Sequence, residues 1–346
     1  MSSLRVVLTS VAVAGLLADP GAGLRAQEDR WRLDAGPLRL DLFVSRTATL
    51  FHVVDQISRW SQFSHAYYLA YFRRPDARLD ATDSSVLKEH AALHKKYGWG
   101  GALERTFYTE LPLDSALARA VGRGLITHDE AQLERRVMLR FEARVDRLMA
   151  EQRETLRQFA GQLLGEGDRV AAYVTPLARF VGVDSFTVPF YLIANPDSMW
   201  SGGGFNGGFL TLEITSRVDP HPSQSLVHEL THAFLSNKQS ALARASHDTP
   251  GLDEETLGEA LAYAMSPGLH HPGNGDPLSN AAARSWVAGW RSDSYSRFNL
   301  YGYVARPFLR DALADTTQTL DTVLPRITAA WTALLELDRL RWPNDR

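Results

Sequence analysis

Apolar residues recur at helical spacing through most of the first half of the chain. The longest amphipathic segment begins at Thr127, which with Glu130 three positions later has the sequence of a capping box. Its apolar stripe consists of Leu133, Val137, Phe141, Val145, Leu148, Leu156, Phe159 and Leu163. Glu and Arg residues occupy the opposite face, so we predict a long helix that packs on a core or on a partner helix.

Two more helices are predicted before this segment. Apolar and aromatic positions keep the helical period over residues 47–73 and stop before a proline. Residues 83–98 show a second helical pattern, with Asp83 or Ser84 as its N-cap and Gly98 just past its end. No residue in this part of the chain belongs to a chemical motif that we recognise.

Strand patterns are fewer and shorter. Residues 38–45 alternate well enough to form a strand, and residues 185–196 are a β-rich run. Pro189 lies inside that run, which predicts an edge strand or a bulge because proline cannot donate a ladder hydrogen bond. The glycine-rich stretch "SGGGFNGGF" at 201–209 predicts a turn that leads into a further strand, "FLTLEIT".

The remainder of the chain is predicted to be helical. Two helices are expected over residues 221–238 and 253–265, and three more patterns follow at 279–290, 301–314 and 324–340. The chain is therefore predicted to be α+β and mostly helical, with a small β-sheet. We divide it into a helical N-terminal region, 27–180, and a second region, 181–346, that carries the candidate chemistry.

The first 26 residues have the outline of a secretory signal peptide. Arg5 lies in a short n-region, residues 6–18 are apolar, and small residues precede a plausible cleavage site after Ala26. This predicts an exported protein, periplasmic or secreted, without a stable membrane span once the signal is cleaved. The apolar stretch is too short for a comfortable span. An uncleaved signal anchor and a buried N-terminal helix are the alternatives.

Charge and cysteine content exclude several classes of function. The formal net charge is −3, from 37 Lys and Arg against 40 Asp and Glu, and no concentrated basic run occurs. There is therefore no electrostatic case for a nucleic-acid partner. The chain has no cysteine, which excludes disulfides, thiolate metal ligands and a cysteine nucleophile.

The sequence "SLVHELTHAFLSN" carries the clearest candidate chemistry. His228 and His232 lie four positions apart on a predicted helix, so both side chains can reach one metal ion. Glu229 follows the first histidine and lies near enough to act on a water molecule without being forced to bind the metal. This is the H-E-x-x-H pattern of zinc hydrolases, in which zinc activates water and the carboxylate takes the proton. Two core or surface histidines are the alternative interpretation.

Catalytic zinc usually has three protein ligands, so a third is needed. Glu259 in "ETLGEALAYAM", 27 positions after His232, is the preferred candidate, and small neighbours would let its helix pack closely on the first. Glu255, one turn earlier, is the alternative third ligand. If Glu255 binds the metal, Glu259 would hydrogen-bond to the ligands without binding the metal itself. The acidic stretch around Glu255 is, however, typical of an exposed helix start.

"HELTH" followed downstream by "LGEALA" resembles the gluzincin metallopeptidases, the group that includes the thermolysin-like enzymes and the zinc aminopeptidases. The resemblance covers residues 181–265 and implies a zincin-like catalytic domain with bound Zn2+, held by His228, His232 and Glu259, and Glu229 as the general base. It implies a peptide or protein substrate. Two departures are that Tyr263 stands where thermolysin-like enzymes have an acid, and that the 27-residue spacing is longer than is typical.

The resemblance has two further implications. Gluzincins pair extended substrate with an edge strand before the motif helix, and "GGFLTLEI" at 207–214 is the expected counterpart. An oxyanion donor is expected after the third ligand, for which Tyr301 is the first choice and Tyr303, His270 and His271 are alternatives.

The prediction is thus an exported zinc metallopeptidase. A zincin-like binding or scaffold protein without activity is the alternative, although retention of Glu229 argues against it. The substrate, the choice between endo- and exopeptidase action, and the oligomeric state stay open.

Overall fold

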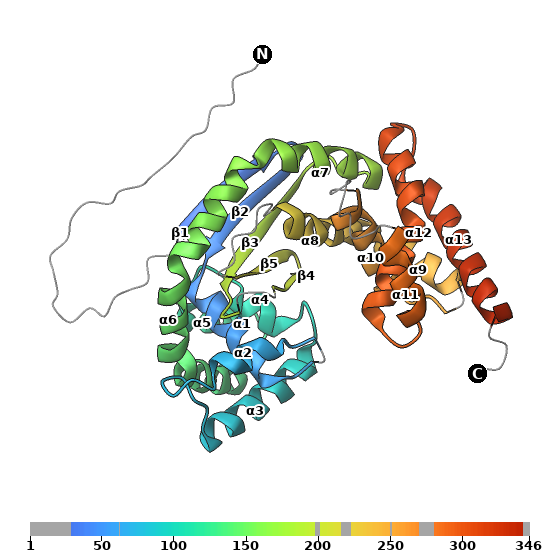
Figure 1. Ribbon diagram of the computed structural model, residues 1–346. Helices are drawn as coiled ribbons and strands as arrows, with labels where there is room; N and C mark the ends of the chain where they lie inside the picture. The colour runs from blue at the N-terminus through green and yellow to red at the C-terminus, as the bar shows by residue number, and fades with distance from the viewer. Residues whose placement is uncertain are drawn as a thin grey trace, which may run out of the picture.

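The computed structural model describes residues 29–61, 63–197, 201–215, 223–249, 251–269 and 280–341. The predicted signal peptide, 1–26, lies outside them. Most of the described chain is helical and surrounds a small mixed sheet, which confirms the α+β, mostly helical prediction (Figure 1). Within the described residues, no helix combines the length and the apolar character needed to cross a bilayer.

One sheet joins strands from both predicted regions. The strands are β1 (Asp29–Ala35), β2 (Leu38–Val44), β3 (Phe186–Ala194), β4 (Gly203–Asn206) and β5 (Phe209–Ile214), in the spatial order β1-β2-β3-β5-β4. Strand β3 lies parallel to both β2 and β5, whereas the β1–β2 and β4–β5 pairs are antiparallel. The boundary at residue 180 therefore runs between neighbouring strands of a single sheet.

Strand β3 is central, so the prediction that Pro189 marks an edge strand or a bulge is wrong. Pro189 pairs with Asp41 of β2, and pairing with β5 begins only one residue later, at Phe190. A proline is tolerated there because the strand has a ladder partner on one side only at that position. The sequence pattern could not show where the second ladder begins.

The N-terminal helices differ from their predicted limits at two places. These helices are α1 (Arg46–Ser58), α2 (Ala66–Tyr71), α3 (Ala81–Tyr97), α4 (Ala102–Phe107), α5 (Leu113–Gly122), α6 (His128–Gly165) and α7 (Gly167–Val181). The single helix expected over 47–73 is two helices, because α1 ends where Arg59 adopts a left-handed conformation with φ of 56°. The N-cap of α3 is Asp80, and Asp83 is its capping-box partner, so neither predicted N-cap is right. The capping box of Thr127 at the start of α6 is confirmed.

The C-terminal helices pack as a second group. They are α8 (Ser223–Leu235), the short turn η1 (Ser236–Lys238), α9 (Gln239–Asp248), α10 (Glu254–Tyr263), the irregular turn η2 (Ala264–Leu269), α11 (Asn280–Gly289), α12 (Ser294–Ala314) and α13 (Leu320–Arg341). Helix α12 packs against α10 and η2, and α8 packs against α7, α10 and strands β4 and β5. Helix α8 thereby connects the sheet with the C-terminal group (Figure 1).

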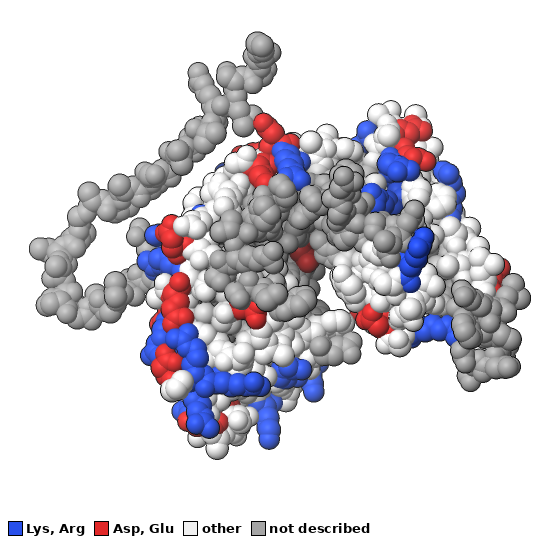
Figure 2. All heavy atoms as spheres, in the orientation of Figure 1, with Lys and Arg blue, Asp and Glu red and all other residues white. Residues whose placement is uncertain are grey.

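Helix α6 supports the other side of the molecule. Its apolar stripe, buried except at the partly buried Leu133, packs against α1, α3, α5 and β3, and its polar face carries charges of both signs. On the face drawn in Figure 2, Lys and Arg side chains are interspersed with Asp and Glu along this helix. Ion pairs such as Arg144 with Asp83 and Arg46 with Asp146 account for part of this pattern.

Candidate metal centre

Helix α8 holds its two histidines in a fixed position because most of its surface is buried. The apolar residues Leu226, Val227, Leu230, Ala233 and Phe234 are all fully buried. With these side chains packed on the sheet and on neighbouring helices, the remaining face presents His228 and His232 one turn apart. The Nε2 atoms of the two rings lie 3.3 Å apart. The local spacing of the motif thus produces the convergence that it predicts.

Helix α10 brings a carboxylate to the same point. The Asp253 side chain caps the helix by accepting a hydrogen bond from the Thr256 N–H at 2.6 Å, and the apolar face of the helix packs toward α8 and α12. Glu259 then faces both histidines. Its Oε2 atom lies 3.5 Å from His228 Nε2, and its Oε1 atom lies 3.4 Å from His232 Nε2.

These separations fit the ligand set of a tetrahedral metal ion. Ligands about 2.0–2.1 Å from zinc in a tetrahedral site stand roughly 3.3–3.4 Å from one another. The nearest separations, 3.3 Å between the two nitrogens and 3.4 and 3.5 Å from each nitrogen to a different oxygen of Glu259, are close to that edge length. Two imidazole nitrogens and one carboxylate are also a donor set that zinc commonly takes. The residues present therefore fit the ion implied by the motif.

The outer nitrogen of His228 is also engaged. Its Nδ1 atom lies 3.3 Å from the backbone carbonyl of Ser266 in η2, to which an Nδ1–H group donates. In the neutral ring, that hydrogen bond keeps the proton on Nδ1 and leaves the Nε2 lone pair directed at the cluster, as is usual for histidines that bind metal. Burial alone would raise the pKa of Glu259, but hydrogen bonds and charge attraction from His228 and His232 in their protonated form outweigh it and hold this pKa well below its usual range.

The cluster is open to solvent on one side. The side chains of His228, His232 and Glu259 are 18%, 22% and 29% exposed, which leaves room for a water molecule or a substrate group beside the ligands. Figure 2 shows the molecule hollowed between the N-terminal helices and the C-terminal helices, and in Figure 1 helices α8 and α10 lie at the upper end of this hollow. Three protein ligands with an open position are typical of catalytic zinc.

Glu229 lies beside the cluster rather than in it. It is partly buried, and its carboxylate lies directly against the main chain of Gly203 in β4. An ideal Cβ atom on Gly203 would be 2.9 Å from Glu229 Oε1. Burial raises the pKa of Glu229, an effect that the neighbouring histidines oppose. A carboxylate that is close to a metal site without contributing a ligand is placed to exchange protons with a water molecule.

The strand next to Glu229 is not the predicted one. The expected edge strand at 207–214 corresponds to β5, which has β3 on one side and β4 on the other. The edge strand is β4, Gly203–Asn206, whose residues were predicted to form part of a turn. The reversal occurs at Gly207 and Gly208, whose φ values of 59° and 100° suit a tight hairpin turn. The two consecutive residues with positive φ, rather than the whole glycine-rich stretch, form the turn.

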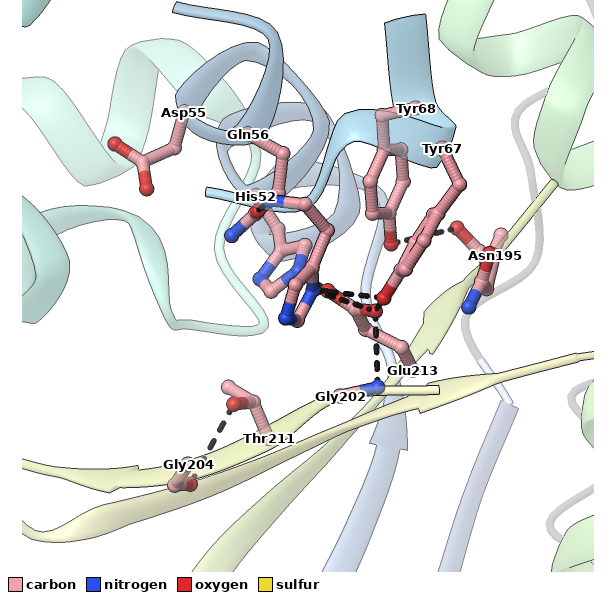
Figure 3. A network of polar contacts seen from close by, with 12 residues as sticks. His52, Asp55, Gln56, Tyr67, Tyr68, Asn195, Gly202, Gly204, Thr211 and Glu213 are labelled. Atoms are coloured by element: carbon pink, nitrogen blue, oxygen red, sulfur yellow. Dashed lines mark hydrogen bonds and ion pairs between the residues drawn. The ribbon is translucent and has the colours of Figure 1, made fainter. Parts of the chain in front are cut away.

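A buried carboxylate fixes the start of β4 (Figure 3). Glu213 of β5 accepts a hydrogen bond from the Gly202 N–H at 3.1 Å, and its own N–H donates to the Gly202 carbonyl at 2.8 Å. The same carboxylate binds His52 Nε2 at 2.7 Å and His65 Nδ1 at 3.1 Å. Burial alone would raise its pKa, but these histidines outweigh burial and lower the pKa to about 2. The position of Gly202, and hence of Gly203 next to it, is therefore set by a charged network.

The alternative third ligand is not part of the cluster. Glu255 is exposed at the start of α10, and burial together with the charges of Asp253 and Glu259 raises its pKa. Among the described residues, the potential metal ligands here whose donor atoms all lie within 4.8 Å of one another are His228, His232 and Glu259.

The structure does not bring the first-choice oxyanion donor to the cluster. Tyr301 is fully buried in α12, where its ring packs against Trp331 and Trp290 at centroid distances of 5.5 and 6.2 Å. Tyr303 packs beside the buried side chains of α11. His270 and His271 lie outside the described residues. A fully buried core tyrosine cannot reach a substrate at the open side of the cluster.

Tyr263 is the tyrosine that lies at the site. Its ring is 4.8 Å from that of His228 in an edge-to-face arrangement, and burial followed by the charge of Glu259 raises its pKa. The sequence places it four positions after Glu259, on the same face of α10. That spacing is the signal by which it could have been selected in place of Tyr301.

Comparison of the chain with protein-family models, with curated proteins and with solved structures gives no match.

Proposed function

We propose that this protein is an exported zinc metallopeptidase of the gluzincin type. The single observation that supports this best is the geometry of His228, His232 and Glu259. Their donor atoms come from two helices and remain partly exposed, and each histidine Nε2 lies 3.3 Å from the other and 3.4–3.5 Å from one of the two Glu259 oxygens. Export is proposed from the signal-like sequence of residues 1–26.

The proposed roles follow from the positions of the side chains. The three residues would hold the zinc ion, which when bound lowers the pKa of water and polarises a carbonyl group. Glu229 takes a proton from the attacking water and passes it to the leaving amine, because its carboxylate is beside the ligands and is not bound to them. Tyr263 replaces Tyr301 as the proposed donor to the oxyanion, since its ring contacts His228.

The edge strand supports a peptide as the substrate. Strand β4 has β5 as its one neighbour in the described sheet, so its other edge presents backbone groups beside Glu229. An extended peptide can pair with such an edge and thereby place a backbone carbonyl near the metal. Gly202 and Gly203 add no side chains of their own here, and the His65 ring lies over Gly202.

The test combines zinc analysis with one substitution. Protein purified without chelators should contain zinc in the cluster and should hydrolyse members of a peptide panel. Glu229→Gln should retain this zinc and lose nearly all turnover, because the amide cannot accept the proton. Glu254→Gln, at an exposed acid on α10, is the matched control and should behave as the wild type.

Two results would contradict the proposal. Zinc could be absent and added zinc could fail to produce activity, or Glu229→Gln could hydrolyse peptides as fast as the wild type. Zinc bound in the cluster, with no hydrolysis of any peptide by the wild type, would instead favour the non-catalytic binding protein.

A further inference from the structure

A second cluster of metal-ligating side chains lies buried among the N-terminal helices. It consists of Asp55 on α1 and of His90 and His94, which are one turn apart on α3. All three residues are buried, with both histidines fully so. Their candidate ligand atoms lie within 4.8 Å of one another. No part of the proposed peptidase mechanism uses this cluster.

The three side chains converge on one point. Asp55 Oδ1 is in direct contact with His94 Nδ1 and lies 3.4 Å from His90 Nε2. The second of these separations equals the edge of a tetrahedral zinc site, roughly 3.3–3.4 Å. Two nitrogens and one carboxylate oxygen form the same donor set as in the cluster on α8 and α10.

Two of the converging side chains are hydrogen-bonded on their outer side to buried partners, and a buried carboxylate faces the outer side of the third. Trp60 Nε1 donates to Asp55 Oδ2 at 2.8 Å, and Glu134 of α6 lies 2.9 Å from His90 Nδ1. Glu104 of α4 faces the outer nitrogen of the third side chain, His94. These partners are 9%, 0% and 2% exposed. Carboxylates and other polar groups that hold the outer atoms of ligands are characteristic of metal sites, where they orient the ligands and raise their basicity.

The position of the His94 ring distinguishes a metal site from a set of hydrogen bonds. Its Nε2 atom is buried without a hydrogen-bond partner, because Glu104 Oε1 is 3.6 Å away. Its Nδ1 atom, on the other side of the ring, contacts Asp55. With Nδ1 bound to a metal ion, the proton of the neutral ring lies on Nε2, directed at Glu104. That carboxylate would then supply the buried nitrogen with an acceptor.

We propose that Asp55, His90 and His94 bind a second divalent metal ion, for which zinc is the best match to the donors. The site is closed on all sides by buried residues, so a substrate has no access to it. Its ion is structural and ties α1 to α3, with α4 and α6 contributing the outer partners. The fourth coordination position is left to a water molecule or to the second oxygen of Asp55. This proposal does not depend on the peptidase activity.

Zinc stoichiometry measured by mass spectrometry on the full chain tests the proposal without disturbing the buried cluster. The wild type should carry two zinc ions per chain. The triple variant with His228→Ala, His232→Ala and Glu259→Ala should still carry one. Removal of that ion by a strong chelator should lower the melting temperature by roughly 5–10 °C, because an ion bound only by the folded state stabilises it. A triple variant that folds and holds no zinc would overturn the proposal.

A substitution in the cluster then locates the remaining ion. In the triple-variant background, Asp55→Asn should lose the zinc while its amide still fills the same space. Asp83→Asn is the matched control, because Asp83 is a buried aspartate at the start of α3 outside the cluster, and this variant should retain the ion. Equal retention of zinc in both variants would contradict the assignment to Asp55. If Asp55→Asn fails to fold, the stoichiometry of the triple variant decides alone.

Discussion

Gly203 provides a direct test of whether Glu229 acts from the place where β4 holds it. Replacement by alanine would add a Cβ atom 2.9 Å from Glu229 Oε1, 3.0 Å from its Cγ and 3.1 Å from its Cδ. Non-bonded heavy atoms prefer separations of about 3.5 Å or more, so the carboxylate must move by about 0.5 Å. Gly203 does not have a positive φ, so alanine brings no backbone strain.

The displaced group is the end of a flexible side chain, and this determines the expected result. Stability should change by less than about 1 kcal/mol, since alanine is also favoured over glycine within a strand. Catalysis is more sensitive, because reacting groups must be held within about 0.5 Å and a 1 Å misplacement costs about 100-fold. We therefore expect Gly203→Ala to lower kcat by about 10-fold or more, with zinc content unchanged.

Gly204→Ala is the control on the neighbouring residue of the same strand. Its Cβ atom would meet Asn206 Nδ2 at 3.4 Å and Thr211 Oγ1 at 3.6 Å, which are ordinary contacts. Steady-state kinetics on one peptide, zinc analysis and thermal melts of both variants complete the assay. Wild-type kcat in Gly203→Ala would refute the position or the role assigned to Glu229. Equal losses in both variants would point to substrate pairing with β4 instead.

Three other predictions concern single residues. Glu259→Gln should weaken zinc affinity by more than about 100-fold, which exceeds the loss typical of a residue that only hydrogen-bonds to a ligand, whereas Glu255→Gln should leave zinc affinity unchanged. Competition with a chelator measures the affinity of both variants, and the reverse order would make Glu255 the ligand. Tyr263→Phe should lower kcat about 100-fold, the loss typical when one oxyanion donor is removed, whereas Tyr301→Phe should lower stability and leave kcat unchanged. An unchanged kcat in Tyr263→Phe would exclude Tyr263 as the oxyanion donor. Burial alone would raise the pKa of Asp83, but Arg144, the backbone N–H of Asp80 and Arg140 together outweigh burial and lower this pKa from 3.8 to about 2. The stabilisation by Asp83 is therefore complete above its unfolded pKa and is lost as the pH falls toward 2. Asp83→Asn should therefore cost on the order of 2 kcal/mol at pH 7 in urea unfolding, and the difference from the wild type should shrink below pH 4; a difference independent of pH would contradict the charge interaction.

The sequence by itself determined the features that depend on residues a few positions apart. The amphipathic period and capping box of Thr127 predicted the helix that is α6, and the four-residue spacing of His228 and His232 predicted their convergence. Glu259 could be preferred over Glu255 because an acidic first turn is typical of an exposed helix start. These inferences succeed because the geometry of one helix fixes which of its own side chains are neighbours.

Only the tertiary structure decided which distant residues meet. It placed Tyr301 in the core and Tyr263 against His228, although both follow Glu259 in the chain. It made β4, rather than β5, the edge strand of the sheet. It also placed Asp55 beside His90 and His94 of α3, although more than 30 residues separate Asp55 from them in the sequence. The spacing of His90 and His94 was visible in the sequence, but their partner was not. Contacts of this kind depend on how whole helices and strands pack, and that packing is set by the combined burial of many side chains rather than by any local pattern.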